Sequence, residues 1–216
     1  MRWQAVIFDM DGTLLETERM VIASGLDAMA ALKLPARRDL LESLVGTITR
    51  DAAHLFEDAY GAGFSMDDLE AEWDRSLARR LAQGIPLRPG ASALLAHLDQ
   101  IGLPRALATN SRTRAAHDHL AKAGIAGFFA EHHIHGRDRV ALPKPAPDLF
   151  LHAAEGLGIA PAQCLVFEDS DPGATGAVAA GMTCVLVPDQ RPPAFAGPHI
   201  RATSLIEGAR IAGLMP

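Results

Sequence analysis

Four short apolar runs, separated by stretches with helical spacing, constrain the fold of this chain more than any other feature. They lie at residues 5–8, 106–108, 165–167 and 185–187. Each run has the length of a buried strand, and polar or turn residues follow it closely. Strands that alternate with helices predict a parallel sheet with helices on both faces. The expected fold class is therefore α/β.

The stretch from about residue 17 to 84 breaks this alternation, because it contains no convincing strand. Apolar residues recur there at helical spacing, as in Leu69, Trp73 and Leu77. Ser65, which is followed by two aspartates in the next three positions, is typical of a capped helix start. This stretch therefore predicts an all-helical domain inserted after the first strand.

The insertion sets the expected domain bounds. Residues 1–15 and 88–216 would form the core, and residues 16–87 would form the helical domain. Glycine and proline punctuate the return to the core. They are Gly84, Pro86, Pro89 and Gly90.

Composition and charge argue against two classes of partner. Apolar residues make up 49% of the 216 residues, which is enough for a sizeable core. The net charge is −6 and no Lys/Arg run is present, so we expect no nucleic-acid partner. No apolar run approaches the ~18 residues that can cross a bilayer, so we expect no membrane partner. We expect a monomer or a weak dimer.

The cysteines and tryptophans are interpreted as packing residues. Cys164 and Cys184 lie in strand-like stretches and are expected to be buried free thiols. Free thiols favour a reducing compartment, so we expect a cytoplasmic location. Trp3 and Trp73 are expected to pack in apolar interiors rather than to bind ligands.

Polar side chains follow the apolar runs. Ligands of open parallel sheets bind beyond the carboxyl ends of the strands, so these side chains should converge at one edge of the sheet. The residues concerned are Asp9, Asp11, Gly12 and Thr13 after the first run, Thr109, Asn110 and Ser111 after the second, Glu168, Asp169 and Ser170 after the third, and Lys144 between the last two.

The chemistry of this set points to phosphoryl transfer. Four carboxylates at one edge would repel one another strongly unless a hard cation joined them, and Mg²⁺ prefers such oxygen ligands. A lysine and a hydroxyl nearby can hold a phosphoryl group. Acyl or hydride transfer would not need this combination.

Each group taken alone has a plainer interpretation. Asp11 followed by Gly12 is a common turn signal. Lys144 could be a solvated loop residue, and residues 109–111 could cap the next helix. These plainer interpretations lose force because the expected topology brings all the groups together.

Two further features are not assigned to the site. Asp171 precedes Pro172 and is expected to cap a helix rather than to bind metal. His132, His133 and His135 resemble a metal-binding tract, but they lie in a polar, loop-like stretch without a cysteine partner. We expect them to be surface side chains.

The polar groups together resemble the signature motifs of the haloacid dehalogenase superfamily. Residues 8–14 (FDMDGTL) are similar to the first motif in its phosphatase form, and Thr109 is similar to the hydroxyl of the second. Lys144 resembles the third-motif lysine, and residues 168–170 (EDS) followed by Gly173 resemble the acidic fourth motif. The four motifs occur in order and span the whole core.

The resemblance implies a Rossmann-like core with a mobile helical cap, and it implies roles for the site residues. Asp9 would be the nucleophile, and Asp11 would be the general acid and base. Mg²⁺ would be held by Asp9, the main-chain carbonyl of Asp11 and Asp169, with Glu168 acting directly or through a water. The phosphoryl oxygens would be held by Thr109, the amide of Asn110 and Lys144.

The implied activity is that of a magnesium-dependent phosphatase that forms a phospho-aspartate. Its substrate would be a small phosphorylated metabolite, such as a sugar phosphate or phosphoglycolate. The cap would supply substrate contacts from Gly46, Thr47 and Arg50. The sequence departs from the frequent family pattern at Glu16, where aspartate is common, and at Pro143, where glycine is common.

Two alternative functions stay open at this stage. A phosphosugar mutase of the β-phosphoglucomutase type carries a histidine in the first cap helix, and residues 19–22 (RMVI) contain none, which favours hydrolysis. A non-enzymatic, phosphate-responsive binding module would share the sheet and the acidic pocket, but it would not need the helical insertion. Dehalogenases lack the second aspartate that Asp11 supplies.

Overall fold

The computed structural model describes residues 2–43, 53–61, 63–189 and 192–216, and the chain divides into two compact units. One unit comprises Met1–Glu16 and Pro86–Pro216, and the other comprises Thr17–Ile85. These boundaries are close to the expected ones. That the helical unit acts as a mobile cap stays a prediction.

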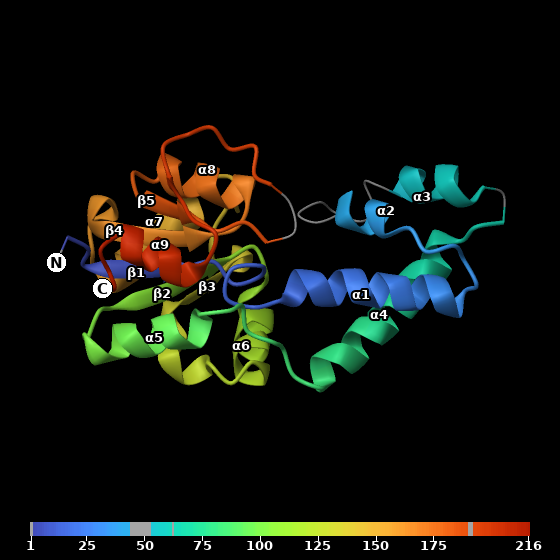
Figure 1. Ribbon diagram of the computed structural model, residues 1–216, viewed down its shortest axis with the longest axis horizontal. Coiled ribbons are helices and arrows are strands. Elements are labelled where there is room, and N and C mark those ends of the chain that lie inside the picture. The colour runs from blue at the N-terminus through green and yellow to red at the C-terminus, as the bar shows by residue number, and fades with distance from the viewer. Residues whose placement is uncertain (1, 44–52, 62, 190–191) are drawn as a thin grey trace. The chain divides into compact units, whose positions relative to one another are not determined.

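The first unit is built on a six-stranded parallel sheet with the order β3-β2-β1-β4-β5-β6 (Figure 1). This sheet confirms the predicted α/β class, and the four expected runs are β1, β2, β4 and β5. The two unpredicted strands, β3 and β6, lie at the edges and are three and two residues long, too short to give a clear periodicity. The strands are β1 Ala5–Phe8, β2 Arg105–Thr109, β3 Ile134–Gly136, β4 Cys164–Glu168, β5 Thr183–Leu186 and β6 Ile200–Arg201.

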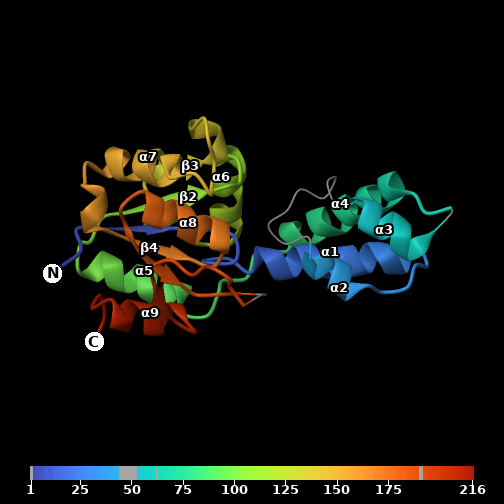
Figure 2. The ribbon, with the colours of Figure 1, turned by 90° about the horizontal axis from the view of Figure 1, so that it is seen from above.

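Helices cover both faces of this sheet, as Figure 2 shows. On one face, side chains of α7 and α8 join an apolar cluster with Ile7, Ala108 and Val166. On the other face lie α5 and α9, where Gly208 of α9 lies against Val185. The helices of this unit are α5 Ala91–Gln100, α6 Thr113–Lys122, α7 Asp148–Leu157, α8 Asp171–Ala179 and α9 Leu205–Ile211, with short 3-10 segments at Ala126–Phe128, Glu131–His133, Arg137–Arg139 and Pro161–Gln163.

The described residues of the second unit form helices and connecting turns, with no strand among them. The predicted helix start at Ser65 is confirmed, because its side chain accepts a hydrogen bond from the Asp68 amide. Apolar side chains, including Trp73, form the interior. The helices are α1 Thr17–Ala31, α2 Arg38–Ser43, α3 Ala53–Tyr60 and α4 Met66–Ala82.

The chain leaves and re-enters the first unit through two paired segments. The Glu16 amide donates to the Pro86 carbonyl at 2.9 Å, and the Arg88 amide donates to the Leu14 carbonyl at 2.8 Å. A single antiparallel bridge between Leu15 and Leu87 lies between these two bonds. The two connections are therefore paired as a short two-stranded ribbon, and all of its residues belong to the first unit.

Other expectations can be checked against burial. Cys164 and Cys184 are buried free thiols, as predicted. Trp3 and Trp73 are both buried, also as predicted. In the described part of the chain, no helix is long and apolar enough to span a bilayer.

Candidate active site

The carboxyl ends of the central strands meet at one edge of the sheet. Phe8, the last residue of β1, pairs with Leu107 on β2 and with Phe167 on β4. The polar residues that continue each strand therefore stand next to one another, as the sequence predicted. Those at or directly after the strand ends are Asp9, Thr109, Glu168 and Asp169.

Lys144 is buried at this edge and is not a solvated loop residue. Its Nζ donates to Asp9 Oδ1 at 2.6 Å and to Glu168 Oε1 at 2.5 Å. Burial opposes the charged form, but the two carboxylates outweigh burial, so the pKa of Lys144 is raised and the ammonium stays charged. The side chain also lies 4.9 Å from the centre of the Phe150 ring.

The Asn110 side chain fixes the segment that carries Lys144. Asn110 Nδ2 donates to the Lys144 carbonyl at 3.1 Å, and Asn110 Oδ1 accepts from the Lys144 amide at 3.0 Å. This two-bond pairing joins the loop after β2 to the loop before α7. The sequence had suggested a role only for the Asn110 main-chain amide.

The negative charge of Asp9 is only partly balanced by its neighbours. Its Oδ2 is buried and has no hydrogen-bond partner among the described residues. Burial raises the pKa of Asp9 to about 8, against the opposing effect of the Lys144 ammonium. Repulsion from Glu168 and Asp11 contributes to this rise. A carboxyl in this environment needs an additional positive charge to stay ionised at neutral pH.

Asp9, Glu168 and Asp169 form a group that fits a metal ion. One carboxylate oxygen from each residue lies within 4.8 Å of the others. An all-oxygen set of this kind suits Mg²⁺. The buried Asp9 Oδ2, which lacks a hydrogen-bond donor, is a suitable ligand atom, so the residues present fit the predicted cation.

Glu168 is more heavily hydrogen-bonded than its neighbours. Besides the Lys144 bond to Oε1, its Oε2 accepts from the Asp169 amide at 3.0 Å and from the Ser170 amide and hydroxyl at 3.1 and 2.9 Å. Gly173 makes room for this carboxylate, because a Cβ there would lie 1.8 Å from Glu168 Oε1. Glycine is therefore required at position 173 for steric reasons.

Asp169 is held by a residue to which the sequence analysis gave no role. Thr13, nearly fully buried, donates its hydroxyl to Asp169 Oδ1 at 3.0 Å. Gly12 lies beside the same carboxylate at φ +85°, and a Cβ there would come within 2.3 Å of Asp169 Oδ2. Residues 12 and 13 thus shape the position of the Asp169 carboxylate, although they lie in the motif that carries Asp9.

Asp11 lies apart from the acidic group and contacts the segment after β2. Its Oδ2 accepts from the Ser111 hydroxyl at 2.7 Å and from the Thr109 hydroxyl at 3.4 Å. His119 Nδ1 on α6 lies 3.8 Å from Asp11 Oδ1. The sequence analysis placed Ser111 near the site without a role and missed His119, because nothing in the helical pattern of α6 marks that position.

Two predictions outside the site were wrong. His135 is a buried residue of β3 whose ring lies 4.8 Å from the His152 ring, so it is not a surface side chain. The error follows from the unrecognised strand. Asp171 does not cap α8, because Ser170 does so by accepting from the Gly173 amide at 3.2 Å. The Asp171 side chain instead accepts from the main chain of Ala194 and Phe195, both at 2.9 Å.

The remaining predicted contacts cannot be placed in this site. Gly46, Thr47 and Arg50 lie outside the described residues.

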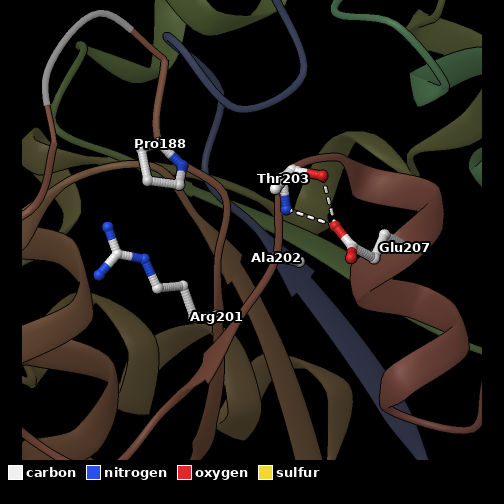
Figure 3. Close-up of a pocket in the computed structure, with 5 residues that line it drawn as sticks. All are labelled: Pro188, Arg201, Ala202, Thr203 and Glu207. Atoms are coloured by element: carbon white, nitrogen blue, oxygen red, sulfur yellow. Dashed lines mark hydrogen bonds between the residues drawn. The ribbon is translucent and has the colours of Figure 1, made fainter.

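Figure 3 shows a hollow elsewhere in the first unit, at β6 and the start of α9. Within it Glu207 Oε2 accepts from the Thr203 amide at 2.6 Å. No residue of the acidic group is among those that line it: Pro188, Arg201, Ala202, Thr203 and Glu207.

A comparison with known families decides the relationship. The haloacid dehalogenase-like hydrolase family matches residues 3–181, most of the chain. The chain belongs to this family. The predicted resemblance to this family is thereby confirmed, and the match covers every core residue proposed for the site.

Curated relatives cover most of the chain. It is 34% identical over 189 residues to a probable pseudouridine-5'-phosphatase of Drosophila melanogaster, covering 86% of this chain and 81% of that protein. It is 36% identical over 200 residues to protein CbbY of Rhodobacter capsulatus, with coverage of 88% and 87%. It is also 34% identical over 191 residues to hexitol phosphatase A of Escherichia coli, with coverage of 87% and 84%.

Solved structures share the fold of this family member. A CbbY variant from Rhodobacter sphaeroides, crystallised with xylulose-(1,5)bisphosphate, matches with a TM-score of 0.72 at 26% identity, covering 99% of this chain and 100% of that one. A putative β-phosphoglucomutase from Thermotoga maritima matches with a TM-score of 0.81, covering 97% and 98% of the two chains. At 24% identity, the second match shows the fold alone.

Proposed function

We propose that this hydrolase is a magnesium-dependent phosphatase that removes the phosphoryl group from a small phosphorylated metabolite through a phospho-aspartate on Asp9. The observation that carries the proposal is the environment of Asp9. One of its oxygens is bound by Lys144, and the other is buried without a hydrogen-bond partner among the described residues. With the metal on that buried oxygen, the oxygen that Lys144 orients would remain to attack phosphorus.

The enzyme class and the substrate class are supported by the relatives. Several are named phosphatases, for pseudouridine 5'-phosphate, hexitol and glycerol 3-phosphate substrates. The chain is accordingly a phosphoric monoester hydrolase, and the non-enzymatic binding module has no support. The spread of names favours a small sugar phosphate or polyol phosphate without selecting one.

The metal would be held by Asp9, Asp169 and the main-chain carbonyl of Asp11. Bound there, Mg²⁺ would supply positive charge that keeps Asp9 ionised and offsets charge on the transferring phosphoryl group. Glu168 already accepts four hydrogen bonds on its two oxygens. We therefore propose that Glu168 acts through a water rather than by direct contact.

The protein groups divide the first chemical step between them. An Asp9 oxygen forms a bond to phosphorus while the bond from phosphorus to the leaving oxygen breaks. Asp11 enters protonated and transfers its proton to that leaving oxygen. Lys144 and Thr109 hold the phosphoryl oxygens, and the ammonium offsets their charge.

The second step reverses the proton transfer. Asp11, now a carboxylate, removes a proton from a water whose oxygen attacks phosphorus. The bond between Asp9 and phosphorus breaks, and Asp9 returns as a carboxylate with release of phosphate. Each proton taken up by Asp11 is the one that it gives to the next leaving group, so the cycle balances.

Replacement of Asp9 by asparagine tests the proposed nucleophile. Asp9→Asn keeps the size of the side chain but removes the attacking carboxylate, so turnover of 4-nitrophenyl phosphate should be lost. Asp171→Asn is a matched control, because Asp171 follows the end of the neighbouring strand β4 but lies outside the acidic group, and it should retain activity. An Asp9→Asn protein that keeps a tenth of the wild-type rate would contradict the assignment.

Metal dependence can be measured by activity and by binding. EDTA should abolish turnover and Mg²⁺ should restore it, whereas Ca²⁺ should substitute poorly because of its looser coordination. Calorimetric titration with Mg²⁺ alone should show binding to the wild type and much weaker binding to Asp169→Asn. Full activity in EDTA would overturn the metal requirement.

The mutase alternative predicts a different product. With a hexose 1-phosphate, a phosphatase should release inorganic phosphate and form no 6-phosphate. The absence of histidine from residues 19–22 motivates this expectation. Accumulation of the 6-phosphate would favour a phosphosugar mutase.

A further inference from the structure

Ser111, which lies two residues before α6, has its main chain held by two neighbouring strands. Its amide donates to Thr109 Oγ1 at 3.0 Å, and its carbonyl accepts from the Arg137 amide at 3.0 Å. Gly136 packs directly against it, because a Cβ on Gly136 would lie 2.6 Å from the Ser111 carbonyl oxygen. The main chain at Ser111 is therefore fixed on both sides by the ends of β2 and β3.

The Ser111 hydroxyl is directed at Asp11. The distance from Ser111 Oγ to Asp11 Oδ2 is 2.7 Å, whereas Thr109 Oγ1 lies 3.4 Å from the same oxygen. The shorter distance is typical of a good O–H···O bond, and the longer one is weak. Thr109 can therefore turn its hydroxyl to a phosphoryl oxygen while Ser111 continues to hold Asp11.

Asp11 needs such a partner because its side chain is partly exposed, at 29%. Water can reach a carboxyl of this exposure, and without a fixed donor its rotamer would be free to change. Proton transfer requires the acid within hydrogen-bond reach of the leaving oxygen. A displacement of about 1 Å in such a group can cost on the order of 10²-fold in rate.

We propose that Ser111 is a positioning residue for Asp11, and that its hydroxyl holds the Asp11 carboxyl in the orientation from which the proton passes to the leaving group. The inference rests on the proposed function, since it concerns the acid of that mechanism. The Ser111 hydroxyl keeps its own proton throughout. The proton that moves belongs to Asp11 and goes to the leaving oxygen as the ester bond breaks.

The test compares two aryl phosphates that differ in their need for an acid. 4-Nitrophenolate is a good leaving group that departs without protonation, whereas phenol resembles tyrosine, with a pKa of about 10, and benefits from a proton. In Ser111→Ala, kcat/KM for phenyl phosphate should fall about tenfold more than for 4-nitrophenyl phosphate, a fraction of the ~10²–10⁴-fold contribution of a full general acid. Ser111→Thr, which keeps a hydroxyl, should restore most of the ratio.

Two controls separate positioning from a loss of folding. Ser204→Ala removes a comparable serine hydroxyl, which caps α9, and should leave the substrate ratio unchanged. The ratio is measured on one preparation, so a partly unfolded fraction cancels. In an Asp11→Asn background, Ser111→Ala should change the ratio no further, because the residue through which it acts is gone.

The outcomes are distinct from those that test the proposed function. Equal losses on both substrates, or no loss on either, would overturn the positioning role and leave the phosphatase assignment intact. A further change of ratio in the Asp11→Asn background would also overturn it. No wild-type turnover of either ester with Mg²⁺ would instead overturn the proposed function, and the inference with it.

Discussion

The edge of the core sheet and the interior of the helical unit are held together in different ways. At the sheet edge, charged and hydroxyl side chains hold one another, and the glycines there are required by carboxylates: Gly12 by Asp169 and Gly173 by Glu168. In the helical unit, Gly25 is required by apolar neighbours, since a Cβ there would lie 2.6 Å from the Leu41 side chain. A change at the edge should alter chemistry, whereas a change in the helical interior should alter stability.

Removal of the Lys144 ammonium should produce the largest effect. Lys144→Met takes away the charge that faces Asp9 and Glu168, and the loss of one stabilising charge at the transferring group costs on the order of 10²–10³-fold in kcat. The measurement is steady-state turnover of several substrates, which should all fall alike. Lys122→Met, which removes an exposed ammonium paired with Asp118, is the control and should be near wild type.

A small loss on some substrates, with normal turnover of others, would show that Lys144 contributes to substrate choice rather than to the common chemistry. That result would weaken the contrast between the two regions.

Two glycine substitutions compare the regions directly. Gly173→Ala should displace the Glu168 carboxylate and lower kcat with Mg²⁺ by about tenfold or more, because the acidic group loses its geometry. Gly25→Ala should leave kcat unchanged and lower the free energy of unfolding by about 1–3 kcal/mol through overpacking. Enzyme kinetics and urea unfolding measure the two effects.

The two tryptophans allow each unit to be followed separately. Trp3 lies in the core unit and Trp73 in the helical interior, and the chain has no other tryptophan. Fluorescence of Trp3→Phe therefore reports the helical unit, and that of Trp73→Phe reports the core. If Gly25→Ala shifted only the core signal, the proposed division of roles would be wrong.

The core unit should also be the acid-sensitive one, because His135 is buried in it, whereas no ionisable side chain is buried among the described residues of the helical unit. Burial, together with the neighbouring His152 and His133, lowers the pKa of His135 to about 4. As the pH falls below ~6.5, the unfolded chain binds a proton that the folded state does not take up until the pH nears its lower pKa. The free energy of unfolding should therefore fall between pH 7 and 4, by at most about 3 kcal/mol.

The difference in free energy of unfolding between wild type and His135→Gln, measured at each pH, isolates the contribution of His135, because the contributions of the other titrating groups cancel. The free energy of unfolding of His135→Gln, measured with urea, should fall less than that of the wild type as the pH decreases. His132→Gln, at an exposed position, should behave like the wild type. An unchanged pH slope in His135→Gln would show that this histidine is already hydrogen-bonded or solvated when folded.

The smallest expected effect concerns substrate choice. Replacement of Thr47 or Arg50 should change the ranking of metabolite substrates far more than the rate with a minimal aryl phosphate, if the helical unit supplies specificity. A panel of phosphorylated metabolites measures the ranking. An unchanged ranking across several such variants, with Mg²⁺ and phosphate binding preserved, would place specificity elsewhere.

The same contrast explains how much the sequence could predict. Asp9, Glu168 and Asp169 could be placed because each lies at the end of a strand signal, and parallel strands bring their ends together. Lys144 lies far from any strand signal and was placed by its resemblance to the third-motif lysine. The helical unit could be predicted as helical from its apolar spacing, but that spacing reports packing and carries no information about a ligand.

What could not be predicted depends on tertiary contacts. The two-residue β6 and the three-residue β3 are strands only because longer neighbours pair with them, so His135 was misplaced with β3. The roles of Thr13 and Ser111 needed the hydroxyls to be seen within hydrogen-bond distance of carboxylates that lie 156 and 100 positions away in the sequence. Nothing local distinguishes these hydroxyls from others in the chain.

The central claim is that Asp9 carries the phosphoryl group between the two steps, and trapping the intermediate tests it most directly. In Asp11→Asn the second step lacks its base. 4-Nitrophenyl phosphate needs no acid in the first step, so substrate labelled in its phosphoryl group should leave the label on the enzyme. With Mg²⁺ and rapid acid quenching, we predict a burst of nitrophenolate near one equivalent, with the label in the peptide that contains Asp9. A burst with the label on another residue, or phosphate release at the burst rate without any labelled protein, would contradict the account.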